Sequence, residues 1–338
     1  MSLNASQIQA IAHKEGPCMV LAGPGSGKTT VITKRIEYLI QQHKVNPEEI
    51  LVITFSKAAT REMKERFQKL NPKKHFPVTF GTFHGIYYGI LKWAYKLTSE
   101  NIFSDEQKYG LLQRVVERMD LDIDDEKEFL QAIAAEISNV KNNQIPLTEY
   151  QSLNCEEETF CSIYHAYEEA RKRQRKIDFD DMLVLTYELF QKRPDILKMW
   201  QRKYKYILID EFQDINQLQY DIIKMMAAPK NHLFVVGDDD QSIYKFRGAV
   251  IENILGFDRK FRDTKVIKLE QNYRSTKYIL DAANSVIRNN IGRKGKELWT
   301  DKDGGDPLEL YVADNENDEA QYVASVIMGE YGRGANWR

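Results

Sequence analysis

The stretch that decides the fold runs from residue 18 to residue 30 and reads CMVLAGPGSGKTT. Its first five residues, Cys18–Ala22, are apolar and predict a buried strand. From Lys28 to Gln41, apolar side chains recur at helical spacing and predict a helix. A glycine-rich turn between a strand and a helix lets backbone N–H groups surround phosphate oxygens, and the helix N-terminus adds positive potential. The sequence therefore predicts an α/β domain with a phosphate-binding turn.

This turn follows the phosphate-loop pattern G-x-x-x-x-G-K-[ST], except that Ala22 takes the place of the first glycine. We expect Lys28 to reach the β- and γ-phosphates of a nucleotide, and Thr29 to ligate magnesium. An ordinary glycine-rich turn is the alternative, but it gives no reason for a Lys-Thr pair at the start of the helix. The residues expected to hold the nucleotide here are Ala22, Gly23, Pro24, Gly25, Ser26, Gly27, Lys28, Thr29 and Thr30.

A second apolar run, from Tyr206 to Ile209, ends in two carboxylates, Asp210 and Glu211. A phosphate loop needs one acid to hold magnesium, and often a second acid to position or deprotonate water. We expect Asp210 in the first role and Glu211 in the second. Paired acids after a strand are often plain surface residues, but together with a phosphate loop they predict nucleotide hydrolysis.

The pattern of elements divides the chain into three parts. Residues 1–88 and 201–275 alternate strands with helices, which predicts a mainly parallel sheet. Residues 89–200 have few glycines and prolines and predict a helical insertion, with helices at Asp105–Met119, Glu126–Lys141 and Cys155–Arg175. Residues 276–338 are expected to begin a second, incomplete domain. The other expected strands are Ile50–Phe55, Tyr206–Asp210, His232–Gly237, Lys265–Leu269 and Leu308–Ala313, and the other expected helices are Ala58–Leu70, Lys277–Asn289 and Asp318–Met328.

Composition excludes several classes of protein. The 338 residues are 42% hydrophobic and 29% charged, which is ordinary for a globular chain. Their apolar runs are short beside the ~20 residues of a membrane span, and the N-terminus lacks the pattern of a signal peptide. Cys18, Cys155 and Cys161 predict neither a disulfide framework nor a metal site, so we expect a cytoplasmic protein. The net charge of −2 leaves room for a local basic groove.

Further motifs extend along the chain. They are Leu3-Asn4 with Gln7, residues 54–59 (TFSKAA) with Glu62-Met63, residues 81–84 (GTFH), residues 210–214 (DEFQD), residues 237–249 (GDDDQSIYKFRGA) and residues 271–275 (QNYRS). In this order and spacing, they resemble the UvrD/Rep/PcrA-like group of superfamily 1 DNA helicases over essentially the whole chain. The resemblance implies a P-loop NTPase fold: a RecA-like parallel sheet with a helical insertion, followed by the start of a second RecA-like domain.

The resemblance also implies how ATP and Mg²⁺ are held. Gln7 is expected to read the edge of the adenine, and Tyr273 to stack on its face. Gln241 is expected to sense the γ-phosphate and to link hydrolysis to the grip on DNA. Arg274 is expected to act as an arginine finger, because a guanidinium spreads positive charge onto the transferring phosphoryl group. Thr30 stands where relatives often carry an arginine beside the adenine.

A third group of residues is expected to bind single-stranded DNA. Bases stack on aromatic rings and phosphates pair with cations, which is the usual basis of binding without sequence preference. The residues are Phe55, Ser56, Lys57, Thr82, Phe83, His84, Tyr244, Phe246 and Arg247. As alternatives, Tyr244 and Phe246 are core residues and His84 is a structural histidine.

The resemblance implies an ATP-dependent DNA helicase or translocase of 3′-to-5′ polarity that acts in DNA repair or replication. Single-stranded DNA and 3′-tailed duplex DNA are its expected partners, with no membrane. We find no match to the later motifs of the second motor domain, so the chain is expected to be an N-terminal fragment. We expect this fragment to hydrolyse ATP weakly. The missing C-terminal domains are expected in the full-length protein. The alternatives are an ATP- and DNA-binding module without unwinding activity, and the motor part of a recombination helicase–nuclease subunit.

Overall fold

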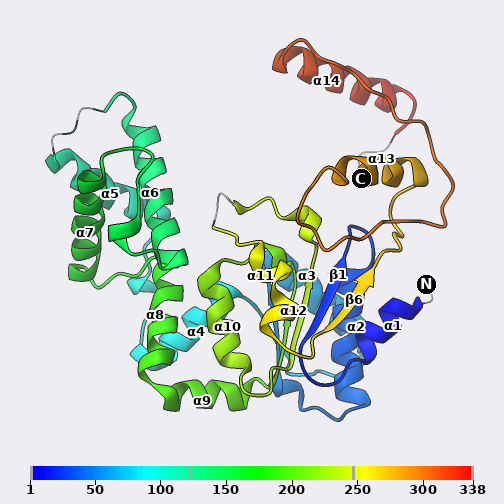
Figure 1. The fold of residues 1–338 in the computed structure, drawn as a ribbon, viewed down its shortest axis with the longest axis horizontal. Helices are drawn as coiled ribbons and strands as arrows, with labels where there is room; N and C mark the ends of the chain where they lie inside the picture. The colour runs from blue at the N-terminus through cyan, green and yellow to red at the C-terminus, as the bar shows by residue number, and fades with distance from the viewer. Residues whose placement is uncertain (1–2, 120, 122, 246–247, 336–338) are drawn as a thin grey trace.

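A sheet of six parallel strands lies at the centre of the computed structural model, which describes residues 3–119, 121, 123–245 and 248–335 (Figure 1). The order across the sheet is β3-β2-β4-β5-β1-β6, and every pair of neighbours is parallel. The predicted α/β fold with a parallel sheet is therefore confirmed. The strands are β1 (Cys18–Ala22), β2 (Ile50–Thr54), β3 (Thr79–Thr82), β4 (Tyr206–Ile209), β5 (Leu233–Gly237) and β6 (Lys265–Leu269).

The central strands are apolar along their whole length because both faces of the sheet are covered. Alternate residues point to opposite faces, so Met19 and Leu21 join one core while Cys18, Val20 and Ala22 join the other. This two-sided burial explains why continuous apolar runs, rather than alternating ones, marked the strands in the sequence.

Two sets of helices cover the two faces. One face is covered by α1 (Ala5–Ala12), α2 (Lys28–Gln41) and α3 (Lys57–Leu70), whose buried residues share a core with the sheet. The other face is covered by α4 (Phe83–Tyr95), α8 (Phe179–Lys192), α9 (Pro194–Lys203), α10 (Gln217–Ala227), α11 (Glu252–Leu255) and α12 (Phe257–Lys260). No helix in the described parts of the chain is long and apolar enough to cross a membrane.

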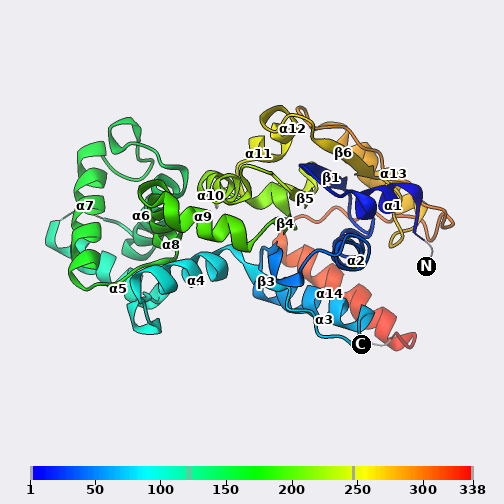
Figure 2. The same cartoon turned by 90° about the horizontal axis from the view of Figure 1, so that it is seen from below.

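Three helices form a bundle beside the sheet, with a core of their own between residues 103 and 167. They are α5 (Asp105–Val116), α6 (Glu126–Asn143) and α7 (Glu157–Arg173), and they lie to one side of the sheet in both Figures 1 and 2. The helices predicted in this region are confirmed, with ends shifted by a few residues. A buried ion cluster joins the bundle to α8: Lys141 Nζ lies 2.7 Å from Asp181 and 3.2 Å from Asp178.

The last part of the chain contains α13 (Lys277–Ile287) and α14 (Glu316–Gly332), as predicted. The strand predicted at Leu308–Ala313 was wrong: the described residues there form no strand. A strand needs a neighbour for its N–H and C=O groups, and this segment has none. Leu310 is 90% exposed and Val312 80%, and α14 has no buried residue and lies away from the sheet in Figure 1.

Candidate active site

The phosphate loop lies between the carboxyl end of β1 and the start of α2, as the sequence predicts. Gly25 and Gly27 have φ angles of +68° and +90°, which favour glycine. The loop is braced from within, because Ser26 Oγ donates a hydrogen bond to the carbonyl of Gly23 at 2.6 Å. Of the other residues expected here, Ala22 ends β1, Pro24 lies in the loop, and Lys28, Thr29 and Thr30 form the first turn of α2.

Lys28 and Glu211 meet although they come from opposite halves of the chain. Lys28 Nζ lies 2.8 Å from Glu211 Oε2. Strands β1 and β4 are separated in the sheet by β5 alone, and the carboxyl ends of parallel strands lie at one edge, where ligands bind. The two motifs singled out in the sequence therefore face each other across that edge.

Asp210 has the surroundings of a metal-binding carboxylate. It is 7% exposed, and one of its oxygens accepts the backbone N–H of Glu211 at 3.1 Å. Burial, followed by repulsion from Glu211, raises the pKa of Asp210 to about 6, and the same two causes raise the pKa of Asp214 to about 6. A divalent cation beside these groups would favour their charged forms. The hard oxygen donors of Asp210 and Thr29 therefore fit Mg²⁺.

Gln7 lies against the phosphate loop. Its Oε1 accepts the backbone N–H of Asn4, and its Nε2 donates to the carbonyl of Ser26 at 2.9 Å. Asn4 also donates from Nδ2 to the hydroxyl of Tyr273 at 2.9 Å. The start of α1 thus brings Gln7 and Tyr273, the two residues expected at the adenine, to the same side of the loop.

Two hydrogen bonds to carbonyl groups of the loop hold the motif of residues 271–275 against it. Asn272 Nδ2 donates to the carbonyl of Pro24 at 2.7 Å, and the backbone N–H of Tyr273 donates to the carbonyl of Gly25 at 3.0 Å. A Cβ at Gly25 would lie 2.8 Å from Cβ of Arg274. Cβ of Arg274 is therefore packed directly against the phosphate loop.

Gln241 ends a short turn that follows β5, Asp239–Gln241. Its Nε2 donates to the carboxylate of Asp238. The backbone N–H of Asp238 donates to Oε1 of Gln213 at 2.9 Å, and Gln213 Nε2 donates to Glu211 at 3.0 Å. Gln241 is thereby linked to Glu211 through two intervening residues, Asp238 by its carboxylate and backbone N–H and Gln213 by its side chain.

Two of the residues expected to bind DNA, Phe55 and His84, line a cavity of about 540 Å³ between the sheet and the helical bundle. The rings of Phe55 and Tyr244 stack with centroids 5.4 Å apart and an angle of 22°. His84 meets Phe179 edge-on at 5.7 Å, and burial lowers the pKa of His84. The cavity is lined by Phe55, His84, Asp105, Ala135, Ser138, Asn139, Asn142, Phe179, Asp180, Asp214, Asn216, Gln219 and Gly248.

The structure gives other residues of this group local roles. Ser56 and Thr82 are N-caps, accepting the backbone N–H groups of Ala59 at 3.1 Å and Gly85 at 3.2 Å. Phe83, expected to bind DNA, is 3% exposed and packs in the core beneath the sheet. Phe83 is the first residue of α4 and lies on the buried face of that helix, so the structure gives it a packing role. Lys57 is exposed at the start of α3.

Two of the expected DNA-binding residues, Phe246 and Arg247, lie outside the described residues. Sequence reasoning missed two others that the structure brings to the site. Phe179 is 46% exposed and lines the cavity. The sequence could have indicated it, because it is an aromatic residue directly before Asp180 at the start of a helix. Gln213 is 2% exposed and touches both Glu211 and Asp238; it stands in the quoted motif of residues 210–214, but the sequence indicated no role of its own for it.

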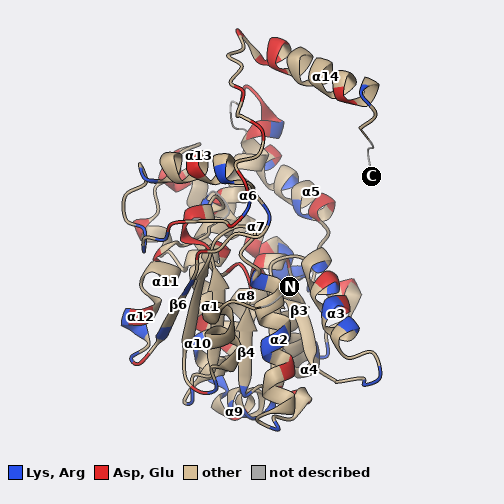
Figure 3. Ribbon diagram, turned by 90° about the vertical axis from the view of Figure 1, so that its right-hand side faces the viewer, with Lys and Arg blue, Asp and Glu red and all other residues tan. Residues whose placement is uncertain are grey.

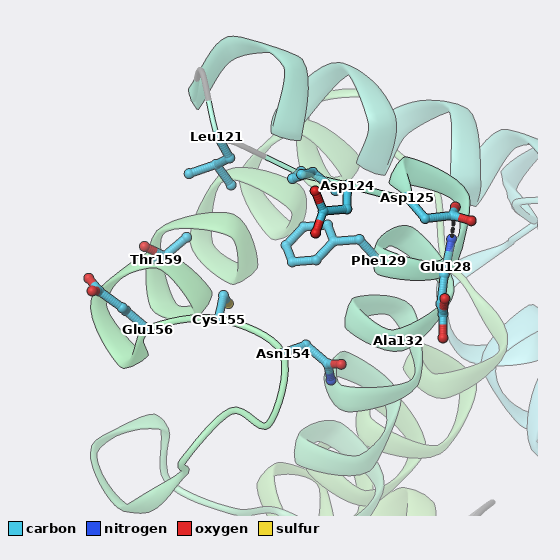
Figure 4. A pocket seen from close by; sticks show the side chains of 11 residues that line it. Leu121, Asp124, Asp125, Glu128, Phe129, Ala132, Asn154, Cys155, Glu156 and Thr159 are labelled. Atoms are coloured by element: carbon cyan, nitrogen blue, oxygen red, sulfur yellow. Dashed lines mark hydrogen bonds between the residues drawn. The ribbon is translucent and has the colours of Figure 1, made fainter.

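A second hollow, of about 600 Å³, lies within the helical bundle and holds none of the expected site residues (Figure 4). Phe129 lines it together with Asp124, Asp125 and Glu128, and Figure 4 shows Asp124 beside the Phe129 ring. Asp125 is occupied as the N-cap of α6, accepting the backbone N–H of Glu128 at 2.9 Å.

Comparison with known proteins agrees with this arrangement. Residues 3–262 match the family model of the UvrD/REP helicase N-terminal domain, and residues 267–335 match that of the UvrD-like helicase C-terminal domain. The chain is 40% identical over 332 residues to the "ATP-dependent DNA helicase PcrA" of Leuconostoc citreum, covering 96% of this chain and 44% of that protein. It is 39% identical over 348 residues to the protein of that name from Staphylococcus aureus strain Mu50, covering 99% and 47%.

The chain thus spans about half the length of the curated relatives that it matches. The described residues of the motifs quoted from the sequence meet at one edge of a parallel sheet, and the family model of the N-terminal domain spans its strands β1 to β5. The resemblance predicted from the sequence is confirmed, and this chain belongs to the UvrD-like family of helicases.

Proposed function

We propose that the chain is the ATP- and DNA-binding part of an ATP-dependent DNA helicase that moves 3′-to-5′ on single-stranded DNA in repair or replication. Membership of the UvrD-like family supports this proposal, as do relatives named ATP-dependent DNA helicase PcrA. The three cysteines are free thiols, which supports a cytoplasmic location.

The observation that carries the proposal is the meeting of Lys28 and Glu211 beside the proposed DNA cavity. Strand β4, which leads to Glu211, pairs with β2, which leads to Phe55. The backbone N–H of Asp210 donates to the carbonyl of Ile53 at 3.0 Å. Groups suited to a nucleotide and groups suited to a base therefore extend from adjacent strands, which is the arrangement that a motor driven by ATP needs.

Each polar residue has a chemical task in this proposal. Lys28 neutralises the β- and γ-phosphates, and Glu211 accepts the proton of the attacking water. Asp210 and Thr29 would hold Mg²⁺, which would supply positive charge to the phosphate oxygens. Gln241 and Arg274 add polar contacts to the transferring phosphoryl group. Gln7 and Tyr273 hold the adenine.

We further propose how the chain is divided. Residues 1–88 and 201–275 form the first motor domain, residues 89–200 its helical insertion, and residues 276–338 the start of a second motor domain. The single sheet built from both halves supports the first assignment, and the separate core of α5, α6 and α7 supports the second. Helices α8 and α9 share the core of the sheet, so the independently packed part of the insertion is the α5–α7 bundle.

A second function, ATP and DNA binding without unwinding, is favoured by one observation. Apolar residues from Leu308 to Val312 and along α14 are exposed, and neither segment packs on the sheet. Unwinding needs two lobes that close on ATP, and these segments form no second sheet among the described residues.

Strand displacement by this chain tests the two functions against each other. The substrates are a 3′-tailed and a 5′-tailed duplex, each with and without ATP, and binding of a fluorescent ATP analogue is measured in parallel. Displacement of the 3′-tailed duplex supports the motor function, and binding of analogue and DNA without displacement supports the second function. Displacement of the 5′-tailed duplex alone contradicts the proposed polarity, and failure to bind the analogue contradicts both functions.

A further inference from the structure

Lys296 lies in the segment that follows α13, and its ammonium group is enclosed by three consecutive carboxylates. Its Nζ is 2.5 Å from Asp238, 2.7 Å from Asp239 and 2.6 Å from Asp240. The side chains of Lys296 and Asp238 are 2% and 0% exposed. A lysine this deeply enclosed is unlike the exposed pairs of the surface, such as Arg288 with Glu297 at 66% and 69%.

The charges in this cluster depend on one another. Burial by itself lowers the pKa of Lys296, but attraction to Asp238 and hydrogen bonds to all three carboxylates outweigh it and raise the pKa. Three adjacent carboxylates repel one another, and burying them is strongly unfavourable unless a cation is present. The folded shape of residues 238–240 therefore depends on Lys296.

Neighbouring residues fasten the same segment to the same turn. Arg293 Nη2 donates to Asp240 at 2.7 Å, and the backbone N–H of Lys294 donates to Asp239 at 2.7 Å. Lys294 Nζ also pairs with Asp258 at 2.6 Å. Figure 3 shows basic and acidic parts of the ribbon close together below α13, near one end of the sheet. Residues 293–296 thus form a clamp on the turn after β5.

That turn is part of the proposed catalytic edge. Gln241 closes it and donates to Asp238. Asp238 is joined through Gln213 to Glu211, which pairs with Lys28. A continuous series of polar contacts therefore runs from the phosphate loop, through the turn that carries Gln241, to Lys296.

We propose that Lys296 is a positioning residue, which fixes the Asp238–Gln241 turn and passes changes at the nucleotide site to the segment after α13. This inference rests on the proposed function of the site and names a further residue for it. Lys296 does not touch the nucleotide or the DNA in this account. It acts through Asp238, which shares its carboxylate between Lys296 and Gln241. Removing the charge of Lys296 should abolish the effect of bound nucleotide on DNA affinity.

A purely structural role gives a different expectation. If Lys296 only stabilised the fold, its loss would lower the melting temperature of the protein, but the folded molecules would respond to nucleotide as the wild type does. The readout that separates the two is the coupling factor, defined as the ratio of single-stranded DNA affinities with and without a non-hydrolysable ATP analogue. Such factors are on the order of 5–150.

The experiment measures this factor by fluorescence anisotropy at one salt concentration, on the full 338-residue chain. The test variant is Lys296→Met, and Arg288→Met, which removes an exposed charge from the end of α13, is the matched control. Because unpaired carboxylates could unfold Lys296→Met, a second variant combines it with Asp239→Asn and Asp240→Asn. These changes remove the repulsion among the three carboxylates, and Asp238 keeps its contact with Gln241. Circular dichroism checks the fold of each protein.

We expect the coupling factor to fall to within about twofold of one in the folded Lys296 variants, as in Gln241→Ala, and to persist in Arg288→Met. A folded Lys296 variant with the wild-type factor overturns the inference. So does a wild-type chain whose DNA affinity is the same with and without the analogue. The proposed function is judged separately, by whether the wild type binds the analogue and Lys28→Ala does not.

Discussion

Lys28 Nζ lies 2.8 Å from Glu211 Oε2, although 183 positions separate the two residues in the chain. The pair links the phosphate loop after β1 to the acidic motif after β4. Lys28 is 14% exposed and Glu211 36%, so both charges are reachable from solvent. A phosphate group at the loop would compete with Glu211 for Lys28, and would release the carboxylate to act on water.

The two acids of this motif should separate in function. Asp210→Ala should lose the magnesium dependence of ATP binding, because its buried carboxylate is the proposed metal ligand. Glu211→Gln should bind ATP but lose most hydrolysis, since the amide cannot take a proton from water. Analogue binding with and without magnesium, and phosphate release, measure the two effects. Glu188→Gln on α8, a side chain that is 44% exposed, is the control. Equal binding defects in the two test variants would contradict this division.

Phe55 and Tyr244 should contribute to DNA binding through stacking. Alanine at either position should cost roughly 1–3 kcal/mol of single-stranded DNA affinity with little change in its salt dependence. Lys57→Ala should instead lower the salt slope by about 0.7, because each phosphate contact releases counterions. Anisotropy titrations at several salt concentrations distinguish the effects, and Tyr95→Ala, an exposed residue of α4, is the control. The stacking account fails if both aromatic variants bind DNA as the wild type does.

Phe83 should matter for stability. Phe83→Ala removes a buried ring from the core beneath the sheet, and should lower the free energy of unfolding by roughly 3–5 kcal/mol. Phe83→Leu keeps most of the apolar volume, and should retain the DNA affinity of the wild type. Urea unfolding and DNA titration measure the two properties. Wild-type stability combined with weak DNA binding in Phe83→Leu would instead place the ring in the DNA site.

The ion cluster between the bundle and α8 should be essential for stability. Lys141→Met removes the cation that Asp178, Asp181 and Glu168 share. Arg171 still pairs with Asp181 and Glu168, but the buried Asp178 loses its salt bridge, which should cost roughly 3–5 kcal/mol. Lys172→Met removes an exposed lysine 3.8 Å from Glu168, and should cost under about 1 kcal/mol. Thermal unfolding compares them, and similar melting temperatures would contradict the account.

Most of the sheet could be predicted from the sequence because its central strands are apolar on both faces, while the edge strand Lys265–Leu269 still carries Ile267 and Leu269 on its buried face. Cys18–Ala22 and Lys265–Leu269 were predicted with the bounds that the structure has. Leu308–Ala313 has the same apolar character, but a strand forms only where another strand pairs with it. The composition of a segment shows its tendency to form a strand, whereas the presence of a pairing strand depends on the rest of the fold.

The residues of the candidate site could be predicted where they belong to a short local motif. Lys28 and Glu211 stand in such motifs, and the structure brings them together. Phe83 also stands in a motif, but burial is decided by how α4 packs against the sheet, and a single sequence does not show this. Lys296 carries no local signal at all, because its three partners lie more than 50 positions away.

Binding of a fluorescent ATP analogue with magnesium, compared between the wild type, Lys28→Ala and the surface control Lys73→Ala, tests the central claim most directly. The account predicts that Lys28→Ala loses at least about tenfold in affinity, since a charged hydrogen bond contributes roughly 1.5–3 kcal/mol, and that Lys73→Ala binds as the wild type does. Unchanged affinity in a folded Lys28→Ala protein would contradict the assignment of this loop to the nucleotide.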